Sequence, residues 1–302
     1  MDIQNNFEVI IIGGSYAGLS AAMSLGRSLR KVLVIDSGLP CNRQSPHSHN
    51  FITQDGVKPS EIAVKAKTQV LEYRTVQFLE DIATEGQQLK GSFLIRTAKG
   101  NAYTAKKLIF ATGIKDIMPD IKGFADCWGI SVVHCPYCHG FEIRQKKTGI
   151  MANGEKAMHI SPLVANLTDK LSILTTGEAN LDKEQLSKLE KHHISIIEKE
   201  IAEFVHENGQ IKHVVFKDGS SEDFEALYAT IPFSQHSNIP ASLGCEISED
   251  GYIKVDGMQK TSVEGVLACG DNSTGMRSVA NAVAKGNIAG AVVNMELVQE
   301  NF

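Results

Sequence analysis

The feature that most constrains the fold lies near the start of the chain. Residues 7–12 (FEVIII) form a short apolar run rich in β-branched side chains, typical of a buried parallel strand. A glycine-rich turn follows, and an Ala- and Leu-rich segment then predicts a helix to about residue 29. Residues 31–36 (KVLVID) predict a second strand that ends in an acid. This order of strand, glycine turn, helix, strand and acid predicts a parallel α/β unit that binds a dinucleotide.

The positions of this turn have separate physical reasons. Gly13 permits the tight bend, Gly18 lets the helix pack closely, and the helix N-terminus offers N–H groups to a pyrophosphate. Asp36 can accept hydrogen bonds from a ribose. Ser15 stands where the pattern has its middle glycine, and we expect it to be tolerated if its φ is negative. The turn residues that we expect to contact the cofactor are Gly13, Ser15, Tyr16, Ala17 and Gly18.

A second signature lies near the end of the sequence. Residues 261–271 (TSVEGVLACGD) are typical of a turn followed by a short apolar strand and a Gly-Asp pair. A Gly- and Ala-rich segment, 278–293, predicts a closely packed helix. An acid at the carboxyl end of a strand, beside a helix start, lies where open α/β sheets bind ligands.

Together these segments resemble the flavoproteins with two dinucleotide-binding domains, most closely the low-molecular-weight thioredoxin reductases. The resemblance implies that the first turn and Asp36 hold the ADP half of FAD, and that the late Gly-Asp motif holds the ribityl chain and flavin. The A-T-G turn at 111–113, the loop around Asn50 and the helix start at 278–279 also resemble family segments, although Ser278 replaces the usual Gln. The further FAD residues so implied are Asn50, Ala111, Thr112, Gly113, Gly270, Asp271, Ser278 and Val279.

The most reactive stretch is 131–140 (SVVHCPYCHG), which contains Cys135 and Cys138. Two cysteines separated by two residues can close a small disulfide, and a thiolate at a helix N-terminus is a nucleophile near neutral pH. Six cysteines in 302 residues are too few for a disulfide scaffold, and the other four are isolated in sequence. The pair therefore indicates redox chemistry or metal binding.

Three other interpretations of the cysteine pair are alternatives to redox chemistry. Zinc needs about four ligands, and His134 and His139 lie too close to the cysteines to complete them, so we predict no metal site. The C-x-x-C-H string matches a c-type haem attachment site, but that chemistry needs export, and we do not expect the opening MDIQNNFEVIIIGG to be a secretory signal. Two inert buried thiols form the third alternative, which the adjacent Pro136 and histidines disfavour.

The resemblance implies roles for the pair, with Cys138 facing the flavin and Cys135 exchanging with the substrate. The family usually has an acid directly after the second cysteine, where this chain has His139. Histidine titrates near neutrality and can move the same proton. C-x-x-C followed by His also resembles relatives that act as dithiol oxidases on small molecules. The predicted catalytic residues are Cys135, Cys138 and His139, whereas His134 is either a second proton relay or a structural histidine.

The family's second nucleotide turn is poorly matched. After the expected strand 148–151, residues 152–157 (ANGEKA) keep only Gly154 and Ala157 of the G-x-G-x-x-G/A pattern. Residues 148–181 contain no arginine to grip a 2′-phosphate, and Glu155 would repel a pyrophosphate. NADPH is therefore a doubtful cofactor, whereas FAD is expected.

The expected fold is α/β with two Rossmann-like domains: a discontinuous FAD domain, 1–115 and 241–302, and an inserted central NAD(P)-binding-like domain, 116–240, carrying the C-x-x-C. A net charge of −5 provides no basic patch for nucleic acid or anionic membrane, and no apolar run approaches the ~18 residues of a membrane span. We expect a cytoplasmic protein, and the resemblance implies a homodimer.

The predicted function is that of an FAD-dependent dithiol/disulfide oxidoreductase. It would pass two electrons between flavin, the Cys135/Cys138 pair and an external thiol or disulfide, either a thioredoxin-like protein or a small molecule. Two alternatives stay open: an oxygen-using oxidase of small-molecule dithiols, and a flavin-bound redox sensor with no efficient turnover.

Overall fold

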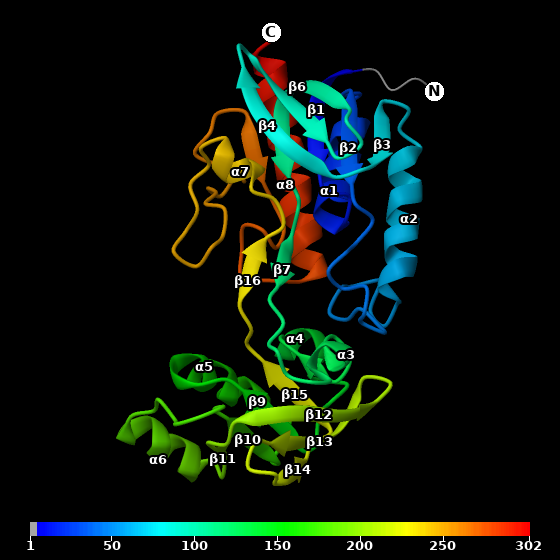
Figure 1. Ribbon diagram of the computed structural model, residues 1–302. Helices are drawn as coiled ribbons and strands as arrows, with labels where there is room; N and C mark the ends of the chain where they lie inside the picture. The colour runs from blue at the N-terminus through cyan, green and yellow to red at the C-terminus, as the bar shows by residue number, and fades with distance from the viewer. Residues whose placement is uncertain (1–4) are drawn as a thin grey trace. The chain divides into compact units, whose positions relative to one another are not determined.

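The computed structural model describes residues 5–302, so residues 1–4 of the opening segment lie outside the described part. The chain forms two compact units (Figure 1). The first contains the residues up to 43 together with 51–115 and 233–302, and the second contains 44–50 and 116–232. Strands β7 (Ile114–Asp116) and β16 (Phe233–Gln235), where the chain passes from one unit to the other, pair as a two-stranded sheet.

The first unit is built on a seven-stranded sheet in the order β3-β2-β1-β6-β5-β4, with β17 paired to β6. Strands β1, β2, β3, β6 and β17 run parallel, so their carboxyl ends meet at one edge, whereas β4 and β5 are antiparallel additions. The strands are β1 (Asn6–Ile12), β2 (Val32–Asp36), β3 (Val76–Glu80), β4 (Ala83–Leu89), β5 (Ser92–Thr97), β6 (Ala102–Phe110) and β17 (Val266–Ala268).

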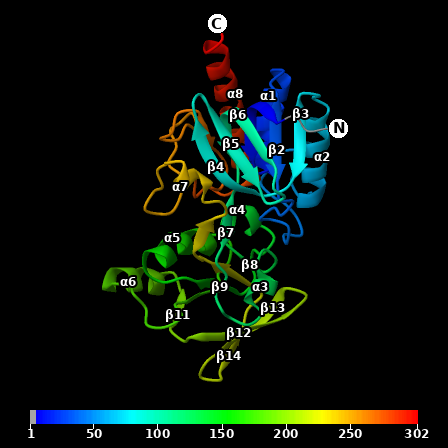
Figure 2. The same cartoon turned by 45° about the horizontal axis from the view of Figure 1, so that its top comes forward.

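Helices α1 (Tyr16–Arg27) and α8 (Val279–Gln299) lie side by side on one face of this sheet (Figures 1 and 2). Their small residues allow the close approach: a Cβ added at Gly286 would lie 2.0 Å from the Ala17 carbonyl oxygen. This explains the Gly- and Ala-rich pattern near the end of the sequence. The first unit also contains α2 (Pro59–Leu71) and the short α7 (Ile239–Ser242).

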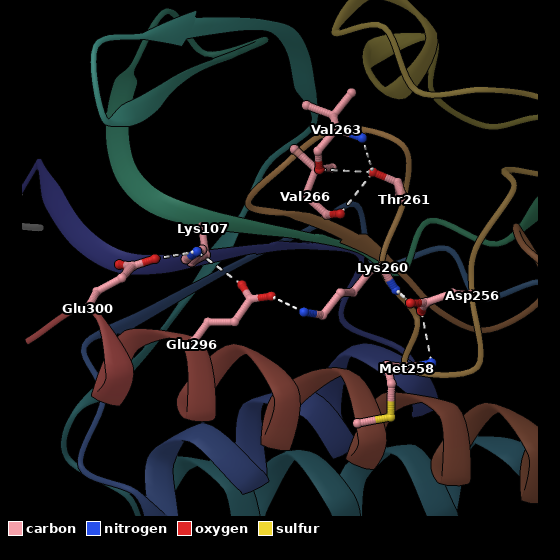
Figure 3. Close-up of polar contacts among 9 residues, drawn as sticks. All are labelled: Lys107, Asp256, Met258, Lys260, Thr261, Val263, Val266, Glu296 and Glu300. Atoms are coloured by element: carbon pink, nitrogen blue, oxygen red, sulfur yellow. Dashed lines mark hydrogen bonds and ion pairs between the residues drawn. The ribbon is translucent and has the colours of Figure 1, made fainter. Parts of the chain in front are cut away.

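A buried ion network ties α8 to the sheet (Figure 3). Lys107 Nζ on β6 lies 3.0 Å from Glu296 Oε2 and 2.6 Å from Glu300 Oε1, and Lys260 Nζ lies 2.6 Å from Glu296 Oε1. Burial alone would lower the pKa of Lys107, but its hydrogen bonds with Glu300 and Glu296 outweigh burial and raise that pKa. The network holds the loop before β17 against the last helix.

The second unit contains a five-stranded parallel sheet in the order β11-β10-β9-β15-β8 and an antiparallel sheet β12-β13-β14. Its strands are β8 (Val132–Val133), β9 (Thr148–Met151), β10 (Leu171–Leu174), β11 (Ser195–Ile197), β12 (Ile201–Glu207), β13 (Gln210–Phe216), β14 (Ser221–Asp223) and β15 (Ala226–Ala229). Its helices are α3 (Phe124–Cys127), α4 (Pro136–His139), α5 (Gly154–Ala165) and α6 (Lys183–Lys191).

The α/β fold with two Rossmann-type units is confirmed, but the units divide the chain differently from the predicted domains. The second boundary lies between residues 232 and 233, not between 240 and 241. The reason is that Ile239 belongs to the hydrophobic core of the first unit, where its Cγ2 would lie 2.4 Å from a Cβ added at Gly86. In the described part of the chain, no helix has the length and apolar character needed to cross a membrane.

Candidate functional site

The glycine turn of the first unit depends on close backbone approach. Gly13 has a φ of +103°, and a Cβ there would lie 2.2 Å from the Ala111 carbonyl oxygen of the A-T-G turn. A Cβ on Gly18 would lie 1.8 Å from the Gly13 carbonyl oxygen. Ser15 has a φ of −87°, the negative value under which a serine is tolerated in this pattern. Both glycines are therefore required by packing at the edge where a pyrophosphate would approach.

The N-terminus of α1 is left open to a ligand. In the part of the chain that the structure describes, the Ser15 side chain makes no capping hydrogen bond and the first turn has no acidic side chain. Asp36, at the end of β2, accepts hydrogen bonds from the backbone N–H of Gly14 at 2.8 Å and of Gly38 at 3.1 Å. A helix N-terminus without a side-chain cap, beside a fixed carboxylate, suits a pyrophosphate and a ribose.

The late Gly-Asp motif meets the same edge of the sheet. Gly270 has a φ of +85°, and a Cβ there would lie 3.0 Å from the Cβ of Ala17 in α1. Asp271 Oδ2 lies 3.6 Å from Arg277 Nε. Ser278 is the N-cap of α8, where its hydroxyl accepts a hydrogen bond from the Asn281 N–H at 3.1 Å. The two sequence signatures are thus brought together in space.

Asn272 is a site residue that the sequence reasoning missed. It is fully buried, and its side-chain amide donates to the Phe110 carbonyl at 2.8 Å and to Thr112 Oγ1 at 3.3 Å, which joins the Gly-Asp motif to the A-T-G turn. Among residues 5–302, nothing donates a hydrogen bond to its Oδ1 atom. A buried amide oxygen without a donor fits a site completed by a bound group such as FAD. An asparagine after Gly-Asp is the signal that could have found it.

Two predicted cofactor residues are placed differently from the rest. Asn50 falls in the second unit, whereas the turn residues belong to the first. The Tyr16 side chain is buried, and its hydroxyl is already used within the protein. It donates to the Pro59 carbonyl at 3.2 Å and accepts from Asn42 at 3.2 Å. Tyr16 can contribute to the turn through its backbone N–H.

The two cysteines of the second unit lie on one helical turn. Cys135 is the N-cap of α4 and Cys138 lies inside it, and both are thiols with Sγ atoms 2.7 Å apart. The Cys135 carbonyl accepts from the Cys138 N–H at 3.2 Å, and the Pro136 carbonyl accepts from the Gly140 N–H at 2.8 Å. The sulfur atoms need little movement to form a disulfide, whose S–S bond is about 2.05 Å.

His139 ends α4 directly beside this pair. Burial lowers its pKa, the charge of His49 lowers it further, and Glu142 opposes both by raising it. The net direction is downward, so the imidazole is neutral near pH 7 and able to accept a proton. The His134 ring lies near the Trp128 ring, with centroids 6.1 Å apart. Among the described residues, no group of three His, Cys, Asp or Glu side chains could hold a metal ion.

Tyr228 is a second residue that the sequence did not single out. It lies on β15, is fully buried, and its hydroxyl would be 3.2 Å from a Cβ added at Gly140. Burial raises the pKa of Tyr228, and the Cys135 thiol and Glu142 raise it further. The run 226–229 (ALYA) looks like any buried strand, so no sequence signal could have marked this tyrosine.

The nucleotide turn of the second unit is closed by its own side chains. Asn153 caps α5, and its Oδ1 accepts from the N–H groups of Gly154 and Asn180, both at 2.8 Å. Its side-chain amide donates to the Glu178 carbonyl at 2.9 Å. Glu155 adds a negative charge in the first helical turn and accepts from Gln185 at 2.7 Å. The Gly154 N–H, the first donor of α5, is therefore already used by the Asn153 side chain.

Comparison with known proteins assigns these features to one group of enzymes. The profile of the family described as pyridine nucleotide-disulphide oxidoreductase matches residues 7–286. A thioredoxin reductase of Claviceps purpurea, tcpT, is 32% identical, with 99% of this chain and 97% of the relative covered. Among solved structures, an oxidoreductase from Agrobacterium tumefaciens is 35% identical with a TM-score of 0.91, covering 97% of this chain and 99% of that one. A putative thioredoxin reductase from Bacillus anthracis is 29% identical with a TM-score of 0.93, covering 98% and 100%.

Proposed function

Because the chain belongs to the pyridine nucleotide-disulphide oxidoreductase family, we propose that it is an FAD-dependent dithiol/disulfide oxidoreductase that works without a normal NADPH site. The observation that carries the proposal is the Cys135/Cys138 pair, with Sγ atoms 2.7 Å apart beside the proton-accepting His139. The external substrate would be a thioredoxin-like protein or a small molecule with two thiols or a disulfide.

The N-termini of two corresponding helices, α1 and α5, bear on the source of electrons. Helix α1 presents its N–H groups without a side-chain cap among the described residues, which suits FAD. Helix α5 has the corresponding place in the second unit, but Asn153 occupies the Gly154 N–H at its start, and Glu155 adds a negative charge. The second unit thus keeps the nucleotide-binding fold while its phosphate site is filled from within.

In the oxidative direction, a substrate thiol attacks Sγ of Cys135 in the enzyme disulfide, and Cys138 leaves as a thiolate. His139 takes the proton of the attacking thiol. The second substrate thiol then attacks the mixed disulfide, so that the substrate leaves as a disulfide and Cys135 is released. The substrate has lost two electrons and two protons, and the enzyme holds two thiols. The Gly13–Gly18 turn, Asp36 and Gly270–Asp271 would hold FAD, which when bound would supply a two-electron acceptor for this pair.

An oxygen-using oxidase of small-molecule dithiols is the second candidate. Asn153 supports it, because without electron exchange with NADPH the electrons would need another acceptor. A flavin-bound redox sensor would share the same site without efficient turnover. The cytoplasm as location and a homodimer as assembly are further proposals, supported by the family resemblance.

The Cys138→Ser variant tests the assigned chemistry. We expect it to lose dithiol turnover while it keeps bound FAD, because the flavin site is built by the first unit and the serine hydroxyl cannot form a disulfide. Cys41→Ser, at an exposed cysteine outside the pair, is the matched control and should turn over normally. Full turnover by Cys138→Ser would rule out the proposed mechanism.

A further inference from the structure

Residues 44–50 belong to the second unit although the segments on either side of them belong to the first. The segment approaches α3 and α4: Gln44 Nε2 lies 3.5 Å from the Ala125 carbonyl oxygen, and a Cβ added at Gly129 would lie 3.4 Å from Ser45 Oγ. His49, at the end of the segment, has its Nδ1 atom 3.6 Å from Oε1 of Glu142. This ion pair connects two parts of the chain that are far apart in sequence.

Glu142 is in turn connected to the predicted catalytic histidine. The Glu142 N–H donates to the His139 carbonyl at 3.2 Å, so the chain continues for another turn after α4. Glu142 therefore follows His139 by three residues across a hydrogen-bonded turn. The Glu142 side chain is 38% exposed and the His49 side chain 18% exposed. Solvent therefore screens their charges only in part, and both charges act on His139.

We propose that His49 and Glu142 are a pair of positioning residues for His139 in dithiol turnover, an inference that rests on the function proposed above. Glu142 lies three residues after His139, His49 contacts the Glu142 carboxylate, and the two act on His139 in opposite directions. The proton of the attacking substrate thiol goes to His139, while the electron pair goes to the Cys135–Cys138 disulfide. The balance between the two partner charges then sets how readily His139 accepts that proton.

Other titratable groups face the same place from each neighbouring element. The 44–50 segment also carries His47, whose ring centroid lies 6.3 Å from that of His49. Tyr228 on β15 stays neutral because burial raises its pKa, and the two cysteines react with the substrate. The Arg144 guanidinium lies over the exposed Phe141 ring, 3.8 Å from its centroid. Beyond burial itself, His49 and Glu142 are the groups whose influence on the pKa of His139 is resolved.

The two partners act in opposite directions, which gives a sharp test. A protonated His49 disfavours a second positive charge on His139, so His49→Gln raises the pKa of His139. This moves the acid limb, the fall in the reduction rate towards low pH, to higher pH. Glu142 stabilises protonated His139, so Glu142→Gln lowers that pKa and moves the acid limb to lower pH. Each shift should be on the order of half a pH unit, since the groups are partly solvated.

The experiment follows anaerobic flavin reduction by dithiothreitol from about pH 5.5 to 9, where histidine titrates. The matched controls are His192→Gln and Glu190→Gln, two exposed residues at the end of α6. His49→Lys places a permanent cation at this position, so the acid limb should not move to higher pH as it does in His49→Gln. The double variant His49→Gln/Glu142→Gln should give an intermediate limb, and its departure from additivity measures the coupling.

Opposite shifts of the two single variants are the expected result. An acid limb that stays fixed in both variants, or that moves the same way in both, would overturn the inference. The proposed function would still hold in that case, provided that the dithiol reduces the flavin. If dithiothreitol fails to reduce the flavin of the unchanged protein, the proposed function itself fails. The proton NMR titration of the His139 ring gives a second readout that needs no turnover, and it should show the same two opposite shifts.

Discussion

At the scale of single residues, Glu296 joins two lysines from different parts of the first unit, Lys107 and Lys260. Burial would raise the pKa of Glu296, but its hydrogen bonds with Lys260 and Lys107 prevail and lower it. A carboxyl whose pKa is lower in the folded state contributes stability above its unfolded pKa and loses it as the pH falls through the folded value. The ion network therefore stabilises the protein near neutral pH and weakens in acid.

Glu296→Gln should lower the free energy of unfolding by roughly 1–3 kcal/mol at pH 7, since Lys107 stays buried with Glu300 as its remaining partner. The loss should shrink as the pH falls through the folded pKa of Glu296, because a protonated glutamate resembles glutamine. Urea denaturation at pH 7 and near pH 4 measures both values. Glu246→Gln, which breaks an exposed pair with Lys254, is the control with a small loss. An equal loss at both pH values would contradict this role of Glu296.

Some residues of the candidate site could be predicted from the sequence, and others could not. Gly13 and Gly18 were predicted because a local pattern of glycines reports a local steric need. Asn272 and Tyr228 were not, since their roles come from contacts with residues distant in sequence, such as Phe110 and Gly140. Glu142 was missed for a related reason: its partner His49 lies in another segment of the chain.

At the scale of elements, the contact of α1 with α8 shapes the expected FAD edge. Gly286→Ala places a methyl group 2.0 Å from the Ala17 carbonyl oxygen, so one helix must move. We expect a loss of about 1–3 kcal/mol of stability, typical of overpacking, together with a lower FAD content. Thermal unfolding and the ratio of flavin to protein absorbance test this. Gly257→Ala, at a position with nothing within 4 Å, is the control, and equal behaviour of the two variants would disprove the packing argument.

Element boundaries were predicted well where the apolar pattern is local. The strand expected at 148–151 is β9 itself, and the strand expected at 7–12 is β1 with one more residue. Strand β6, which leads into the A-T-G turn, extends back to Ala102, where its first part pairs antiparallel with β5. Helix α8 runs to Gln299 rather than 293, since buried Leu297 and the Glu296 ion pairs extend it. These extensions depend on tertiary contacts that no sequence window contains.

At the scale of the whole molecule, the chain contains two units of related fold whose nucleotide turns differ. The first keeps Gly13, Gly18 and an uncapped helix among the described residues, whereas the second has Asn153 at its helix N-terminus and Glu155 after it. The sequence itself shows that the second turn lacks a glycine of the pattern and that residues 148–181 contain no arginine. It could not predict that the Asn153 side chain would take the backbone donors, because this depends on the approach of residues 178–180.

We propose that electrons enter through a dithiol and not through NADPH. The most direct test is to mix the purified flavin-loaded protein anaerobically with NADPH, NADH or dithiothreitol, each separately, and to follow the flavin absorbance. We predict rapid bleaching by dithiothreitol and none by either nicotinamide, and recovery on admitting oxygen would favour the oxidase. Rapid bleaching by NADPH would contradict the claim, since it would require the α5 turn, closed by Asn153, to bind a nucleotide.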